Sequence, residues 1–188
     1  MAFADPTHFA RAAQTVDDLL AHLTSTQWEA PTPCTDWNVT QVTQHVVEVN
    51  LSFAQQLHPT GSQTLSGSEE PGDLLDRYRF STAVMQRALA RTVAPSTDLP
   101  TQLRSRLALR VADLLLHGWD IAAATGQSRH GAGDLALEAL TFAQRHAAAL
   151  QRSGQFAPPQ PIDDHAPAID RLAALSGRVV PGFPADST

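Results

Sequence analysis

Apolar residues recur at three- and four-residue spacing in five stretches of the chain, which is the pattern of amphipathic helices. The first stretch follows Asp5 and Pro6, a helix cap with proline at the first helical position. The second follows Asn38, with Gln41 placed three residues later to complete a capping box. The apolar stripes of the first three predicted helices are Phe9, Ala13, Val16, Leu20 and Leu23; Val39, Val42, Val46, Val49 and Phe53; and Leu74, Tyr78, Ser81, Met85 and Leu89.

Two further helices are predicted in the second half of the chain. One runs from Leu103 to Ala124, after the helix breaker Pro100 and before Gly126, a residue suited to a helix end. The next runs from about Asp134 to Gln151. No internal repeat and no run with the alternating pattern of a strand is found.

Two segments lack this periodicity. Residues 58–72 are rich in Gly, Ser and Thr, which predicts a polar loop. The tail from Gly154 onward contains six of the 13 prolines and is expected to be extended, with one short helix at Ala168–Leu175. We therefore expect an all-α four-helix bundle with an additional helix and a proline-rich C-terminal extension. The expected division is a bundle of residues 1–153 and a tail of residues 154–188 that packs on it.

The fourth predicted helix has an unusually narrow polar side. With residues placed at about 100° intervals, its charged and histidine residues from position 106 to 120 lie within an arc about 80° wide. The other positions are almost all apolar, so this helix is expected to be central in the bundle. The arc either faces solvent through a slot, with ordinary ion pairs along it, or lines a polar cavity. Its members are Arg106, Arg110, Asp113, His117 and Asp120.

Three residues on two of the helices form a candidate metal site. Asp113 and His117 are four residues apart, so their side chains leave the same side of the helix about one turn apart. His45 lies at the edge of the apolar stripe of the second helix, where it can point toward a cavity between helices. Two imidazoles and a carboxylate suit zinc, nickel, cobalt, manganese or ferrous iron, with open positions for water or substrate. The alternative is that they are unconnected polar residues, because a single histidine at such a position is often a structural, hydrogen-bonded one.

Composition excludes several classes of protein. The length of 188 residues suits one domain, and the net charge of −6 argues against a nucleic-acid partner. All 13 basic residues are arginine, which excludes a lysine Schiff base and a P-loop lysine. One cysteine allows no internal disulfide, and no apolar stretch reaches the roughly 18 residues of a membrane span. With no signal peptide in view, we expect a cytoplasmic protein with no membrane partner.

Four more residues have two interpretations each. Asp120 can act with the imidazole of His117 or on a bound water, as a catalytic residue, or it can pair with an arginine. Arg110 is the candidate for binding an anionic substrate; otherwise it forms a plain salt bridge with Asp113. Cys34, without a base nearby in the sequence, is expected to be a packed structural residue. His165 can reach the site if the tail folds over it, or can lie free on the surface.

Three segments resemble one known family. PTPCTDWNVTQVTQHVVEVN (31–50) and ADLLLHGWDIAAATGQ (112–127) are similar to the two motifs of the N-terminal metal-binding domain of mycothiol-dependent maleylpyruvate isomerases. They look closest to the related single-domain actinobacterial proteins. The tail PIDDHAPAIDRLAALSGRVVPG (161–182) resembles the C-terminal extension of that group.

The resemblance implies a DinB/YfiT-like bundle that holds a divalent metal through His45 and His117. Zinc is the expected metal, with nickel, iron and manganese as alternatives. Asp113 takes the place of a glutamate in the isomerase and is one methylene shorter, so it either binds the metal directly, binds it through a water, or leaves the metal with two protein ligands. Related proteins use the metal to ionise a small thiol such as mycothiol, which then serves S-transfer, conjugate addition or isomerisation. The isomerase also has a C-terminal domain that helps to build its active site, so maleylpyruvate isomerisation is not expected of 188 residues.

The resulting prediction is a metal-dependent enzyme of the isomerase or S-transferase type, which activates a small thiol or water. Its expected partners are a small anionic substrate, a low-molecular-weight thiol and a second copy in a homodimer. Two alternatives remain open. One is a cyclase, isomerase or hydrolase of secondary metabolism that uses the metal without a thiol. The other is a metal- or ligand-binding protein without catalytic activity.

Overall fold

A computed structural model describes residues 3–34, 36–58, 73–93 and 100–181 of the chain. In these ranges every long element is helical, as predicted. The elements are α1 (Pro6–Ala21), the short 3₁₀ helix η1 (Gln27–Glu29), α2 (Val39–Leu57), α3 (Leu74–Thr92), α4 (Thr101–Thr125), α5 (Gly133–Arg152) and α6 (Ala168–Leu175). The predicted polar loop at 58–72 lies, apart from its first residue, outside the described residues.

The predicted helix starts are confirmed by their capping contacts. The Asp5 side chain accepts hydrogen bonds from the backbone N–H groups of Thr7 and His8 at 2.7 and 3.0 Å. Asn38 and Gln41 form the predicted capping box, with each side-chain oxygen accepting from the other residue's backbone N–H. These contacts satisfy N–H groups that a helix start leaves without partners, so the sequence determines both starts locally.

The ends of the first, fourth and fifth predicted helices differ from the structure by one or two residues. The fourth helix extends from Thr101 to Thr125 rather than from Leu103 to Ala124, and it ends at Gly126 with φ of 71°. The first helix ends at Ala21, before the last residue of its predicted apolar stripe. The chain turns there because Thr24 bonds to the side chain of Gln27, where η1 begins.

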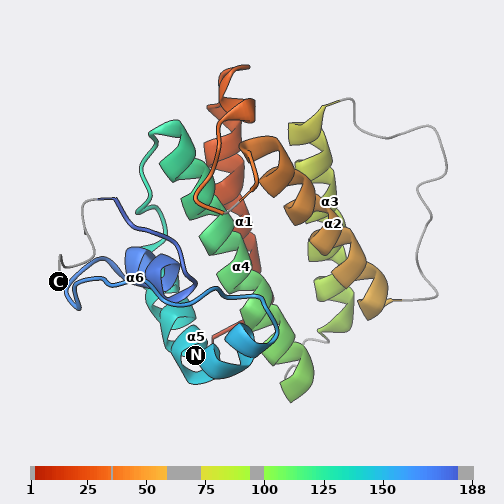
Figure 1. The fold of residues 1–188 in the computed structure, drawn as a ribbon. Helices are drawn as coiled ribbons and strands as arrows, with labels where there is room; N and C mark the ends of the chain where they lie inside the picture. The colour runs from red at the N-terminus through yellow and green to blue at the C-terminus, as the bar shows by residue number, and fades with distance from the viewer. Residues whose placement is uncertain (1–2, 35, 59–72, 94–99, 182–188) are drawn as a thin grey trace.

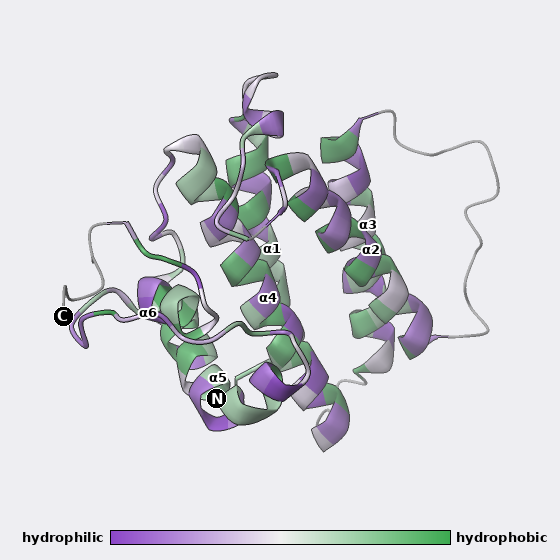
Figure 2. Cartoon of the chain, in the orientation of Figure 1, coloured by the Kyte–Doolittle hydropathy of each residue, from purple (hydrophilic) through white to green (hydrophobic). Residues whose placement is uncertain are grey.

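Helix α4 lies at the centre of the bundle, as its narrow polar arc predicted. It packs against α1, α2, α5 and α6, and Figure 1 shows it crossing the middle of the molecule. Leu107, Val111, Leu114 and Ile121 on this helix are fully buried. In Figure 2 the long helices carry green and purple residues side by side, as expected for amphipathic elements. None of the helices in the described ranges has the length and apolar character needed to cross a membrane.

The described part of the tail is attached to the bundle by specific contacts. Phe156 is buried, and its N–H donates to the carbonyl of Leu150 on α5 at 3.1 Å. Asp170 on α6 accepts a 2.6 Å hydrogen bond from the indole N–H of Trp119 on α4. These contacts fix residues 154–181 beside α4, whereas the expected boundary at residue 153 stays a prediction.

Candidate metal centre

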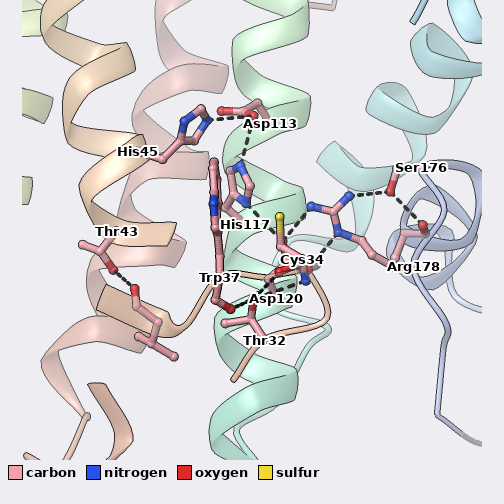
Figure 3. Close-up of polar contacts among 12 residues, drawn as sticks. Thr32, Cys34, Trp37, Thr43, His45, Asp113, His117, Asp120, Ser176 and Arg178 are labelled. Carbon is pink, nitrogen blue, oxygen red and sulfur yellow. Dashed lines mark hydrogen bonds and ion pairs between the residues drawn. The ribbon is translucent and has the colours of Figure 1, made fainter. Parts of the chain in front are cut away.

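His45, Asp113 and His117 come together between α2 and α4. Their ligand atoms all lie within 4.8 Å of one another. Asp113 Oδ1 is 3.3 Å from His117 Nε2 and 3.8 Å from His45 Nε2. Figure 3 shows the two imidazoles and the carboxylate pointing toward one another. Asp113 and His117 on one helix and a histidine on a neighbouring helix therefore bring three potential ligand atoms close enough together to hold one metal ion.

These residues line a cavity of about 520 Å³. Arg106, Arg110, Asp113 and His117 from the polar arc of α4 all face it. Four of the five residues of the arc thus line a cavity that is partly open to solvent, and Arg110 and Asp113 also form an ion pair of the kind that the other interpretation expected. The volume is within the usual range for small-molecule sites. Trp37 also lines the cavity, with its ring 4.9 Å from that of His45.

Asp113 is positioned by Arg110. The Arg110 guanidinium is buried and donates to Asp113 Oδ2, which leaves Oδ1 facing the two histidines. It also donates to Asn50 Oδ1, at 2.9 and 3.2 Å, and to the carbonyl of Val46, at 3.0 Å. Burial raises the pKa of Asp113, but the charges of His117 and Arg110 outweigh burial and hold the pKa well below its usual range. The carboxylate is therefore ionised at neutral pH and available as a ligand.

His117 is held between two carboxylates. Its Nε2 faces Asp113, and its Nδ1 lies 3.0 Å from Asp120 Oδ2. Asp120 is fully buried, and Arg178 from the tail donates to both of its oxygens at 2.8 and 2.7 Å. Burial raises the pKa of Asp120, but hydrogen bonds from Arg178 and His117 outweigh it and lower the pKa. An ionised carboxylate can only accept, so Nδ1 must carry the hydrogen, and the neutral imidazole presents the Nε2 lone pair to the cavity.

In the absence of a metal, His117 binds a second proton readily. Burial lowers its pKa, but the carboxylates of Asp113 and Asp120 outweigh burial and raise the pKa to about 9. The imidazolium would donate to both carboxylates at once. A metal that binds through Nε2 must therefore displace a proton at neutral pH.

The structure shows which partners Arg110 and Asp120 have. Arg110 forms the salt bridge with Asp113 that was the simpler of its two interpretations, and its other hydrogen bonds go to α2. Asp120 does not line the cavity; it contacts both His117 and Arg178, the two kinds of partner that the sequence left open. A catalytic role for Asp120 and an anion-binding role for Arg110 stay predictions.

Cys34 lines the cavity and lies within 4.8 Å of ligand atoms of His117 and Asp120. Burial and then the charge of Asp120 raise the pKa of its thiol to about 11. Both Asp120 oxygens already accept from Arg178. A protonated thiol and an engaged carboxylate make this group a poor second metal site. His165 is exposed and does not line the cavity.

Three residues with clear positions in the site were not found from the sequence. Arg178 approaches Asp120 from 58 positions further along the chain, which no local pattern indicates. Asn50 is buried and bonds Arg110, and its place on the same side of α2 as Val46 and Phe53 was the available signal. Trp37, in the turn before α2, packs against the core and also against His45 and His117.

Comparison with known proteins places the chain in a family. Residues 9–122 match the family described as mycothiol maleylpyruvate isomerase N-terminal domain. Two proteins of Mycobacterium tuberculosis, from strains CDC 1551 and H37Rv, are each 32% identical over 179 residues, which is 90% of this chain and 95% of theirs. Both are described as uncharacterized. No solved structure matches the chain significantly. The family match covers both segments that supply the candidate ligands, and the chain belongs to the mycothiol maleylpyruvate isomerase N-terminal domain family.

Proposed function

We propose that the protein is a divalent-metal-dependent enzyme that activates a small thiol, or water, at His45, Asp113 and His117. The observation that supports this best is the convergence of two imidazoles and one ionised carboxylate on a cavity of about 520 Å³. The donor set fits a divalent metal of the zinc type, because three protein ligands leave a position open for a reacting group. Zinc is our first choice, with nickel, iron and manganese as alternatives.

Each residue of the site has a proposed part. His45 and His117 present imidazole nitrogens, and Asp113 presents Oδ1 while Arg110 holds its other oxygen. Asp120 keeps the Nδ1 hydrogen of His117 in place. A bound divalent metal would supply the positive charge that favours the ionised form of a thiol or of water. Apolar side chains and the Trp37 ring form much of the cavity wall around this position.

The thiol part of the proposal is supported by the family, which is named for a mycothiol-dependent isomerase. We therefore propose mycothiol, or a thiol like it, as cosubstrate, and S-transfer or thiol-assisted isomerisation as the reaction class. Zinc as the metal, the cytoplasmic location and the homodimer stay predictions from the sequence.

Metal analysis of the purified protein tests the proposal. We expect about one divalent metal per chain, and at least a tenfold lower content in His45→Ala and His117→Ala. His165→Ala is the matched control, since this histidine is exposed and away from the cavity. A wild-type protein purified without chelator and found free of metal would refute the proposed function.

Calorimetric titration of mycothiol into the metal-loaded protein tests the cosubstrate. Binding that disappears in His117→Ala supports a thiol-dependent enzyme. Metal without thiol binding would instead favour a hydrolase, cyclase or isomerase that uses the metal alone. A broad screen of thiols and electrophiles without any turnover would favour a binding protein.

A further inference from the structure

The cavity extends from the metal centre along the seam between α2 and α4. Arg106 lines it seven residues before Asp113, which is two helical turns or about 10 Å along α4. On α2, His45 faces Asp113, and Phe53 lies beside Arg106. The two helices are thus antiparallel here, and both bound the space between the candidate ligands and Arg106.

The walls of this space are apolar. Its apolar lining residues are Val49 and Phe53 from α2, Leu109, Ala112 and Leu116 from α4, and Phe156 from the tail, beside Gly154 and Gln155. Such a wall favours the hydrocarbon part of a ligand, because each apolar group that leaves water on binding contributes to affinity. A wholly polar ligand would leave its hydrogen-bonding groups without partners along this stretch.

Arg106 differs from the other two arginines that line the cavity. Arg110 and Arg178 each form ion pairs with a buried or partly buried carboxylate. Arg106 contacts uncharged groups: its guanidinium lies 4.7 Å from the centroid of the Phe53 ring and donates to the side-chain oxygen of Gln56. None of the ion pairs among the described residues involves Arg106. Its charge therefore remains available at the far end of the cavity from the histidines.

We propose that the second substrate is an amphipathic anion, with an aromatic or aliphatic body and one carboxylate or sulfonate group. Its anionic group pairs with Arg106, its body lies along Phe53 and Leu109, and its other end reaches the space beside Asp113. This assigns to Arg106 the anion-binding role that the sequence suggested for Arg110. The proposal rests on the proposed function in taking this cavity as the substrate site.

Two fluorescent probes with the same ring system test the assignment. The anionic probe is 8-anilino-1-naphthalenesulfonate, and N-phenyl-1-naphthylamine is its neutral counterpart. We expect Arg106→Gln to raise the Kd of the anionic probe roughly fivefold, as for a partly exposed charge pair, while the Kd of the neutral probe changes less than twofold. Arg106→Lys should retain most of the anionic probe's affinity. Arg87→Gln, at an exposed arginine away from the cavity, should change neither Kd.

Phe53→Ala locates the probes. We expect it to weaken both, because both lose the same apolar contact. The proposal would be overturned if Arg106→Gln left binding of the anionic probe unchanged or weakened both probes equally. It would also be overturned if Phe53→Ala left binding of both probes unchanged.

The metal content of every sample is measured in parallel, and the titrations are repeated after chelation. Arg106-dependent binding to a protein that was purified without chelator and is free of metal supports the anion site and refutes only the proposed metal enzyme. If the metal-loaded protein binds the anionic probe equally well with and without Arg106, the anion site is refuted and the proposed metal enzyme is not. The two proposals can therefore fail separately.

Discussion

Replacing Arg178 with alanine should destabilise the protein strongly, although Arg178 lies far along the chain from the helix that it contacts. Asp120 is fully buried, and Arg178 donates two of its hydrogen bonds. Charge-assisted hydrogen bonds contribute roughly 1.5–3 kcal/mol each, and removing one partner of a buried ion pair costs roughly 3–5 kcal/mol. Both approaches predict a loss of about 3–5 kcal/mol in the free energy of unfolding at pH 7. Urea denaturation followed by circular dichroism measures it.

The pH dependence gives a second test of the same contact. The folded-state pKa of Asp120 lies below its ordinary value, so its ionisation stabilises the fold above the ordinary pKa. That contribution is lost as the pH falls through the folded-state pKa. Arg178→Ala removes the main hydrogen bonds that lower the pKa, so Asp120 in the variant takes up a proton at higher pH. The difference between variant and wild type should therefore be largest near neutral pH and smaller at about pH 4.

A surface ion pair provides the control. Arg79 donates from Nε and Nη2 to the two oxygens of Asp17, at 2.7 and 3.2 Å, in the same paired geometry but exposed to solvent. Arg79→Ala should change stability far less, because water screens the pair and replaces its contacts. Arg178→Met keeps most of the apolar stem and separates lost packing from lost charge. Equal effects of Arg178→Ala and Arg79→Ala would refute the reasoning.

Three further predictions concern metal binding, the thiol and one glycine. Because the metal-free protein holds the pKa of His117 at about 9, apparent zinc affinity should rise up to tenfold per unit between about pH 6.5 and 8.5, measured against a competing chelator. The same protonation stabilises the metal-free fold below pH 6.5, and this contribution is lost as the pH rises through about 9. Cys34, with its pKa raised from 9.0 to about 11, should react with iodoacetamide at pH 8 roughly tenfold more slowly than free cysteine. Its thiolate fraction is about a hundredfold smaller, but the higher intrinsic nucleophilicity of that thiolate partly offsets this. Unfolding in urea should remove the difference in rate. Gly177→Ala should cost roughly 1–3 kcal/mol in urea denaturation, because φ is 98° and a Cβ would lie 2.5 Å from that of Ala157. Gly133→Ala, where a Cβ meets open space, should be close to neutral.

The sequence predicted the fold well where the determinants are local. The Asn38–Gln41 box and Gly126 act within a few residues, so the start of α2 and the end of α4 could be placed from the chain alone. The central position of α4 also followed from the sequence, because the width of a polar arc depends only on helical periodicity. Helix α6 was placed at its observed bounds, Ala168–Leu175, ahead of Gly177.

The site was predictable only in part, because its remaining contacts join distant segments. The four-residue spacing indicated that Asp113 and His117 share a side of α4, and the family resemblance supplied His45 as their partner. Periodicity could not show that Arg178 would reach Asp120, since that contact depends on the path of a proline-rich tail. Nor could it separate Arg106 from Arg110, which lie on one arc but differ completely in burial.

The residues around Asp113 explain how an aspartate side chain, one methylene shorter than glutamate, is placed in the site. Arg110 binds Asp113 Oδ2 from the preceding helical turn and is itself bonded to Asn50 and to the carbonyl of Val46 on α2. The helix that supplies His45 thus also positions Arg110, and through it the carboxylate on α4. A glutamate at this position would carry its oxygens one methylene further out, whereas burial and three hydrogen bonds to α2 hold the Arg110 guanidinium in place. Aspartate, Arg110 and Asn50 are therefore interdependent, and the distance between Asp113 Oδ1 and the two imidazoles is determined by this α2–α4 contact as much as by the length of the side chain.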